Sequence, residues 1–294
     1  MPDQPWTIAD AEDAYAEADL ERTLEICELL LERNPDDADA LYLMGEAMLE
    51  LEEYEAAEEI FRDALGLEPE AGGLYNGLGV ALFEQCRFDG ARKALETALE
   101  LDPRIAEARM YLGFFHERRG EAEQAEEQYR QAEGLDPEHF QMPAPLTIEQ
   151  VQQSVELVID RMPEQLRSYF SGIPWGIEDL PSTATLTRQQ PPMSPLLTCL
   201  FEGEVRDPTR VVSPLDHAPA EIVLYCRNFE KTIRGPEDLP AALLNAMLVE
   251  MEHFLALDEA EVEALGLAEL ARQPALSPEM ATLEQSVPPN GYLH

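Results

Sequence analysis

A period of 34 residues runs through the first half of the chain and restricts its fold more than any other feature. Prolines and small residues keep this phase: Pro35, Pro69, Pro103 and Pro137; Gly45, Gly79 and Gly113; Ala57, Ala91 and Ala125; Ala64, Ala98 and Ala132. Larger apolar residues recur with them at helical spacing: Met44, Leu78 and Leu112; Phe61, Leu95 and Tyr129. Since small residues let helices approach closely and proline ends a helix, each period predicts one pair of packed helices.

This pattern resembles the tetratricopeptide repeat. The resemblance is close over 38–71, 72–105 and 106–139, and poor over 4–37, where Asp10 and Ala11 stand in place of the usual Leu-Gly pair. It implies that residues 1–140 form an α-helical solenoid in which the first helix of each unit lines a concave groove.

The resemblance also implies which side chains face that groove. They are Tyr42, Glu46 and Leu49, then Asn76, Val80 and Phe83, then Met110, Phe114 and Glu117. This set predicts an apolar groove with acidic edges, which would bind an amphipathic helix or extended peptide with flanking Lys or Arg. The basic residues with which some members clamp a C-terminal carboxylate have no evident equivalents here. Alternatively, the same apolar residues pack against the next domain.

The charge of the chain limits its partners. It has 60 Asp and Glu against 20 Lys and Arg, a formal net charge of −40. Such a charge argues against a broad nucleic-acid or anionic-membrane surface, so we expect a neutral or basic protein partner. We find no apolar run of membrane-spanning length and no signal-peptide pattern, and we read the four cysteines as reduced core residues. These features predict a cytoplasmic, bacterial-type protein.

A different pattern begins after a short linker at 141–145. Thr147 is expected to cap a helix that runs to about Met162, followed by a second helical stretch over 163–170. Short apolar runs at 173–177, 196–201 and 221–225 predict strands, with Pro-rich loops between them, and 239–257 predicts a long helix. The second half is therefore expected to be an α+β domain.

Residues 146–267 resemble the small bacterial zincin-like metallopeptidases, also called minimal zincins. Four segments carry the resemblance: 162–166, 196–203, 219–225 and 249–259. In the family, the third segment is the edge strand beside the active site. The fourth lies where the family has HExxHxxGxxD.

In that motif two histidines and an acid bind zinc, and the first glutamate is the general base. The resemblance gives Glu250 the base position, His253 the position of the second histidine and Glu259 that of a carboxylate ligand. Val249 replaces the first histidine and has no lone pair to donate. Ala256 replaces a glycine at which the chain turns sharply. With one ligand missing we expect no cofactor, and zinc only if the site works.

Other readings of this segment remain open. Glu250 could itself ligate a metal together with His253, but the general base would then be lost. The loop residue His217 could reach the site, or the segment could be an ordinary amphipathic helix. The tail, 268–294, is predicted to be loosely ordered.

Together these features predict a non-catalytic interaction or scaffold protein, whose repeats bind a partner segment and whose zincin-like domain has lost a ligand. The first alternative is an active zinc metallopeptidase that recruits its substrate through the repeats. The second is a structural adaptor whose C-terminal domain only caps the solenoid.

Overall fold

The computed structural model describes residues 6–211 and 213–271. Its contacts divide the chain into two units, Met1–Met142 with Ser182–Pro195, and Pro143–Pro181 with Leu196–His294. A short segment from the second half of the sequence thus belongs to the first unit. Each unit is described below by itself.

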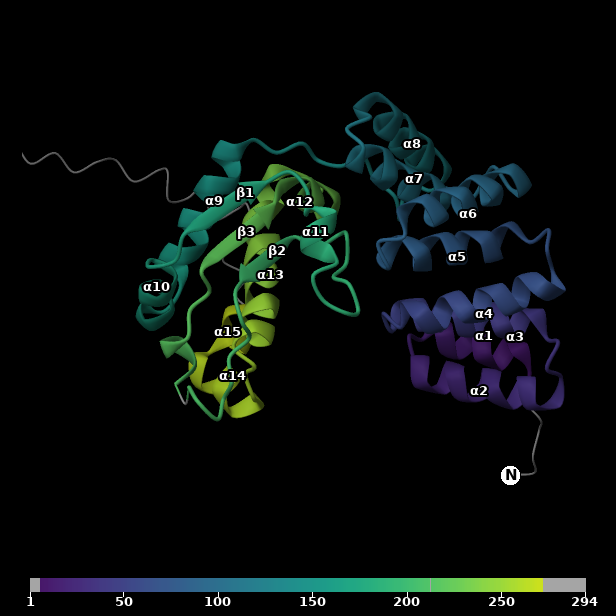
Figure 1. Cartoon of the computed structure of the whole chain (residues 1–294), viewed down its shortest axis with the longest axis horizontal. Helices are drawn as coiled ribbons and strands as arrows, with labels where there is room; N and C mark the ends of the chain where they lie inside the picture. Colours follow the sequence, from purple (N-terminus) through teal and green to yellow (C-terminus); the bar gives the residue numbers. More distant parts are fainter. Residues whose placement is uncertain (1–5, 212, 272–294) are drawn as a thin grey trace, which may run out of the picture. The chain divides into compact units, whose positions relative to one another are not determined.

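The first unit is a series of helical hairpins (Figure 1). Its repeat helices are α1 (Ile8–Ala16), α2 (Leu20–Arg33), α3 (Ala38–Glu50), α4 (Tyr54–Leu67), α5 (Gly72–Glu84), α6 (Phe88–Leu101), α7 (Ala106–Arg118) and α8 (Ala122–Leu135). Each helix packs on the next along the chain, and the first helices α1, α3, α5 and α7 also contact one another in order. The predicted α-helical solenoid is confirmed.

The repeated glycines are the places where paired helices meet. A Cβ added at Gly45 would lie 2.7 Å from the ring of Phe61, and one added at Gly79 would lie 2.6 Å from Leu95. Gly113 faces the ring of Tyr129 in the same way. Because each large residue fills the space of a missing Cβ, the two in-phase sets of the sequence form one contact repeated in three units.

The first unit of the solenoid reaches the same packing with different residues. Ala11 stands at the glycine position, and Cys27 stands where the other units have Phe, Leu or Tyr. Both residues are fully buried in one apolar cluster. A larger residue on one helix is thus matched by a smaller one on its neighbour, which keeps the core filled.

The turn inside every hairpin has the same backbone conformation. Ala18, Glu52, Cys86 and Gly120, again 34 residues apart, have φ of 58°, 62°, 60° and 71°. In the second tetratricopeptide repeat, Glu52 N–H donates to Leu49 O and Glu53 N–H donates to Met48 O, at 3.0 and 2.9 Å. This is the Schellman end of a helix, which favours glycine at the left-handed residue. Only one of the four positions has glycine.

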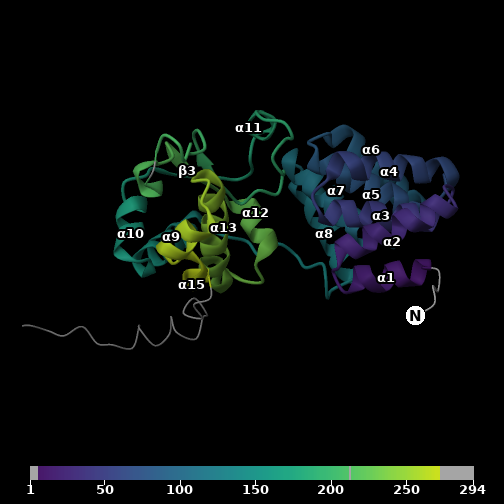
Figure 2. The same cartoon turned by 90° about the horizontal axis from the view of Figure 1, so that it is seen from below.

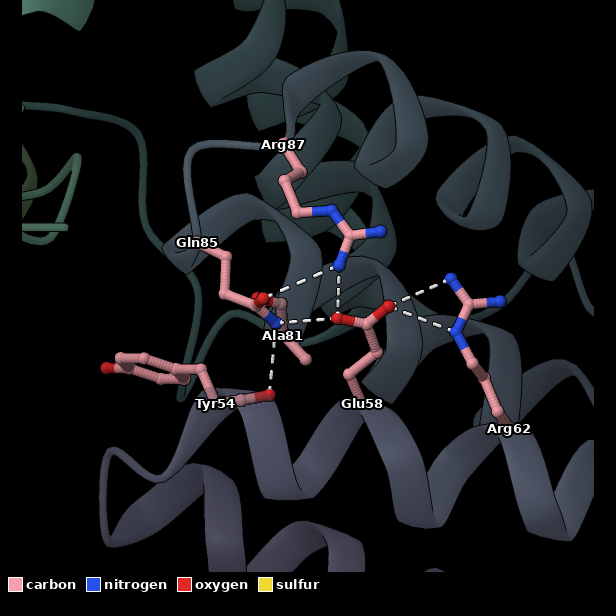
Figure 3. A network of polar contacts seen from close by, with 6 residues as sticks. All are labelled: Tyr54, Glu58, Arg62, Ala81, Gln85 and Arg87. Atoms are coloured by element: carbon pink, nitrogen blue, oxygen red, sulfur yellow. Dashed lines mark hydrogen bonds and ion pairs between the residues drawn. The ribbon is translucent and has the colours of Figure 1, made fainter. Parts of the chain in front are cut away.

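A carboxylate ties two neighbouring units together (Figure 3). Glu58 on α4 accepts from Arg62 Nε at 3.0 Å, from Gln85 Nε2 at 3.0 Å and from Arg87 Nη1. Gln85 also donates to the carbonyl of Tyr54 at 3.1 Å. Burial raises the pKa of Glu58, but the hydrogen bonds from Gln85, Arg62 and Arg87 outweigh it and leave that pKa below its usual range.

The second unit combines a three-stranded sheet with helices. The elements are α9 (Ile148–Arg161), α10 (Glu164–Phe170), β1 (Trp175–Glu178), β2 (Cys199–Glu202), β3 (Glu221–Tyr225), α12 (Cys226–Thr232), α13 (Leu239–Phe254), α14 (Glu259–Leu265) and α15 (Leu267–Ala271), with 3₁₀ turns at Pro214–Asp216 and Pro236–Asp238. Thr147 caps α9 with a capping box, as predicted. The order of strands is β1-β3-β2.

The sheet corrects one expectation. The resemblance predicts an edge strand within residues 219–225, but β3 is the central strand, parallel to β1 and antiparallel to β2. Ile222, Val223, Leu224 and Tyr225 are all buried, which suits a strand that is covered on both faces and paired on both sides, whereas β1 is only partly covered. Burial alone does not make a strand central, because Cys199, Leu200 and Phe201 of the edge strand β2 are buried as well.

Helix α13 organises the core of the second unit. It packs against α9, beside which it lies in Figure 2, and against β2. Its buried residues include Leu243, Met247 and Met251. Leu267 and Leu270 of α15 join this core, so the first residues of the predicted tail, 268–271, are helical. The rest of the tail, 272–294, lies outside the described residues.

Candidate functional site

Most of the predicted groove residues are packed inside the protein. Asn76, Val80, Phe83, Met110 and Phe114 are buried, whereas Tyr42 is 39% exposed and Glu46 is partly exposed. The expected open apolar lining is therefore not what the structure shows, because the aromatic rings pack on one another. Phe83 lies 5.3 Å from Tyr111 and 6.1 Å from Phe114 between ring centroids. A role for these residues in peptide binding stays a prediction.

Polar side chains gather on the face formed by the first helices. Asn76 Nδ2 on α5 donates to Glu107 Oε2 on α7 at 2.6 Å. Burial, then Glu107 and Glu50, raise the pKa of Glu46 on α3 to about 8. Burial also raises the pKa of Glu107, against the hydrogen bond from Asn76. These carboxyl groups thus lie close enough to repel one another when both are ionised.

Sequence reasoning missed Glu107 although a signal was present. It occupies the second position of its repeat unit, one of the positions that face the groove in the family. The prediction named only residues at the fifth, ninth and twelfth positions. Tyr15 on α1 belongs to the same surroundings, since Glu46, Glu50 and Glu107 help burial to raise its pKa to about 12.

A second buried carboxyl group contacts the segment that comes from the other half of the sequence. Glu84, at the end of α5, accepts from Ser194 Oγ at 2.7 Å, and Cys86 Sγ lies 3.7 Å from the carbonyl of Met193. Residues 182–195, with the short helix α11 (Thr183–Leu186), thus pack on the turn between α5 and α6. Burial raises the pKa of Glu84 to about 7, although the hydrogen bond from Ser194 opposes the shift.

The residues at the expected metallopeptidase position lie near the end of α13. Glu250 Oε1 accepts from the backbone N–H of Phe201 on β2 at 3.2 Å. Burial, and then the charge of Glu250, raise the pKa of Cys199 on the same strand. Val249 beside it is 69% exposed. Glu250 is therefore held against the sheet, in a hollow lined also by Val249 and Cys199.

The two predicted metal ligands, His253 and Glu259, do not line this hollow. His253 is exposed on the helix surface, and Glu259 is the exposed first residue of α14, beside a different hollow lined by Glu252 and Val262. Within 6–211 and 213–271 no group of three His, Cys, Asp or Glu is arranged to hold a metal ion. The residues present do not fit a catalytic zinc site, which needs three protein ligands around one point.

The sharp turn after α13 is nevertheless kept. Ala256 has a φ of 45°, in the left-handed region where the family has glycine. Ala256 N–H donates to His253 O and Leu257 N–H to Glu252 O, both at 3.1 Å, which is again a Schellman end. The sharp turn that the resemblance predicts is thus present, with alanine at the left-handed residue.

Beneath this turn a buried cation supports α14. The side chain of Arg206 is only 2% exposed, and its Nη2 donates to Glu261 at 2.7 and 3.0 Å. Its backbone N–H donates to Phe254 O at 2.9 Å. The loop after β2 is thereby fixed to the ends of both helices.

Comparison with known families identifies both halves of the chain. Two family models of the tetratricopeptide repeat match residues 14–78 and 76–139. The model of the zincin-like metallopeptidases matches residues 170–268. Both predicted resemblances are confirmed.

Solved structures with similar folds cover less than half of the chain. A MamA protein from Desulfovibrio magneticus RS-1 is 21% identical, with 44% of this chain and 73% of that chain covered and a TM-score of 0.40. TTC0263, a thermophilic TPR protein in Thermus thermophilus, is 26% identical over 44% and 73%, with a TM-score of 0.41. YrrB, a TPR protein with an unusual peptide-binding site, is 30% identical over 45% and 68%, with a TM-score of 0.38.

No curated protein matched the chain. Among the described helices, none is both long enough and apolar enough to cross a membrane. The family matches and the two units of the fold lead to one conclusion: the chain is a fusion of tetratricopeptide repeats with a zincin-like metallopeptidase domain.

Proposed function

We propose that this protein is a non-catalytic interaction scaffold whose repeats bind a segment of a partner protein. The observation that carries the proposal is the match of residues 14–139 to a repeat family that builds extended binding surfaces. The exposed ring of Tyr42 and the partly exposed residues Glu46 and Glu107 offer that surface to a partner. The chain's charge of −40 favours a partner with basic residues beside the bound segment.

The zincin-like domain takes part as a binding or bracing surface rather than as a peptidase. Val249 holds the position of a metal ligand, and Glu250 is bonded to the backbone of β2. The hollow at this place is lined by small and apolar groups, among them Ala242, Ala246 and Leu197. We propose that it contacts a second protein chain or supports the first.

We extend the proposal to a cytoplasmic location. All four cysteines are free thiols, and three of them, Cys27, Cys199 and Cys226, are buried. Disulfides are rare in reducing compartments, where free thiols of this kind persist.

Selection of peptides from a random display library on the full chain tests partner binding. We expect the library to yield enriched peptides whose affinity for the parent chain falls at high salt. The same peptides should bind Tyr42→Ala more weakly than the parent chain. The control is Leu101→Ala, which removes an apolar side chain of similar exposure from the second helix α6. Failure of the parent chain to enrich any peptide, or equal binding by Tyr42→Ala, would contradict the proposal.

Elemental analysis of zinc tests the loss of catalysis. We expect no stoichiometric zinc in the parent chain. Val249→His should bind more zinc than the parent, because it places two histidines four residues apart on an exposed helix face, although these supply only two of the three ligands of a catalytic site. Stoichiometric zinc in the parent that is lost in His253→Ala would instead support the alternative of an active zinc metallopeptidase.

A further inference from the structure

The face of the first helices contains hydrogen-bond acceptors that lack donors. Asn76 is only 7% exposed, and its Oδ1 has no hydrogen-bond partner. Its Nδ2 is bonded to Glu107, so the amide points into the carboxyl cluster. Oε1 of Glu46 is also buried without a partner. Leaving such atoms unpaired inside a protein is unfavourable.

The cluster gains negative charge when its carboxyl groups ionise, which is unfavourable. Burial, Glu107 and Glu50 raise the pKa of Glu46, and burial, Glu46, Glu107 and Tyr15 raise the pKa of Tyr42. In the described part of the chain neither Glu46 nor Glu107 forms an ion pair with a lysine or arginine. What the ionised cluster lacks is therefore both a donor and a positive charge.

We propose that Glu46, Glu107 and Asn76 together hold one lysine or arginine side chain of the partner protein, with the ring of Tyr42 beside it. This rests on the proposed function and names the chemistry by which the repeats would recognise their partner. An ammonium or guanidinium group carries several donors and no acceptor, so it can satisfy the free oxygens of Asn76 and Glu46 at once. It also relieves the repulsion between the two carboxyl groups.

The position of Tyr42 fits this role. Its ring is partly exposed, at the edge of the cluster, and packs near Phe61 with centroids 6.4 Å apart. An aromatic ring held in place beside carboxylates can contact the stem and the charge of a basic side chain. The buried acceptors would determine how deeply the charged group enters the cluster.

A titration of the full chain at pH 9, where Glu46 is ionised, tests the proposal without knowledge of the partner. The probes are N-acetyl-arginine amide and N-acetyl-lysine amide, each compared with N-acetyl-citrulline amide, which has nearly the shape of the arginine probe but no charge. Binding is followed by NMR through the side-chain amide of Asn76 and the ring of Tyr42. We expect at least one basic probe to bind about ten-fold more tightly than the citrulline probe, the ratio expected for one charge-assisted hydrogen bond.

Two variants locate the binding. Glu46→Gln keeps the shape of the side chain and should lower the affinity for the basic probe about ten-fold. The matched control is Glu12→Gln, which makes the same charge change at the equivalent position of the first unit, where the residue is exposed on α1. Equal affinity for citrulline and basic probes, or equal losses in the two variants, would overturn the proposal.

The outcomes separate this inference from the proposed function. If the parent enriches peptides that contain no basic residue and bind Glu46→Gln equally well, the scaffold function stands and the cation site is wrong. If no peptide is enriched but the basic probes bind as described, the cation site stands and peptide capture by the repeats is wrong.

Discussion

The first repeat unit and the end of α13 both depart from their family patterns, but with different results. In the first unit, alanine replaces glycine at Ala11, and the smaller Cys27 on the facing helix restores the fit. At α13, Val249 stands where the resemblance predicts a histidine, and within the described residues no group of three possible ligands is arranged to hold a metal ion. A packing requirement can be met by changing the neighbour's volume, whereas a metal site needs a lone pair at one fixed point.

Both regions have kept their backbone where the side chains changed. Ala18 in the first repeat unit and Ala256 after α13 have left-handed conformations that glycine would adopt more easily. The hydrogen bonds of the helix end and the surrounding core determine the turn in both cases. The four predictions that follow probe this contrast between a retained framework and a lost chemical group.

The largest effect is expected at the buried ion pair of the zincin-like unit. Glu261→Ala leaves the Arg206 guanidinium without its carboxylate in a site where the side chain is 2% exposed. We expect the free energy of unfolding to fall by about 3 kcal/mol, measured by denaturant titration.

The control for that variant is Glu259→Ala, which removes the carboxylate at the predicted ligand position. Glu259 is exposed in the same first turn of α14, so we expect a change within about 0.5 kcal/mol. A large loss in Glu259→Ala would show that this position still carries a structural or ligand role.

The compensation seen in the first unit can be tested by copying it. Gly113→Ala forces a Cβ into the ring of Tyr129 and should lower stability by about 2 kcal/mol. Adding Tyr129→Cys reproduces the pair found at Ala11 and Cys27. We expect the double variant to lose less than the sum of the single losses, by at least about 1 kcal/mol.

Gly66→Ala is the matched control, because a Cβ at Gly66 meets nothing within 4 Å. It should be neutral or slightly stabilising. Additive losses in the Gly113 and Tyr129 cycle would show that the match in the first unit is coincidental.

The third effect is the dependence of folding stability on pH, which two buried carboxyl groups of the repeats determine. The pKa values of Glu46 and Glu84 are raised to about 8 and about 7, so the folded state holds protons that the unfolded chain releases near its ordinary carboxyl pKa of 4.5. This stabilisation is complete below 4.5 and is lost as pH rises through 7 to 8. The free energy of unfolding should therefore fall between pH 6 and pH 9.

Thermal unfolding of the parent and of the variants Glu46→Gln and Glu84→Gln measures this effect. In each variant, stability should decrease less than in the parent as pH rises. Glu58 acts in the opposite direction, since its lowered pKa adds stability that is lost as pH falls below the ordinary carboxyl value. A parent chain whose stability is constant from pH 6 to pH 9 would show that Glu46 and Glu84 are ionised throughout.

The smallest effect is expected at the left-handed turns. Ala256→Gly and Glu52→Gly should each raise stability by about 1 kcal/mol, because glycine adopts their φ without the contact between Cβ and the backbone. Gly120→Ala, at the equivalent turn of the last unit, should lower it by a similar amount. Destabilisation by Ala256→Gly would mean that its methyl group contributes more than the strain removes.

The repeat architecture could be predicted from the sequence because its information is local and repeated. The pairs Gly45 with Phe61 and Gly79 with Leu95 are each 16 residues apart, and the same spacing appears again in the next unit. Helices and strands of the second unit were found for the same reason, as apolar spacing and the cap at Thr147 act over a few residues.

Only the tertiary structure decided which polar side chains are in contact. Asn76 and Glu107 are 31 residues apart, and Ser194 and Glu84 are 110 apart, so no local pattern links them. The central position of β3 likewise depends on pairing with two strands that both precede it in the sequence. Sequence periodicity determines how one unit folds, whereas burial, and with it the pKa of a carboxyl group such as Glu46, is set by neighbours that only the assembled fold brings together.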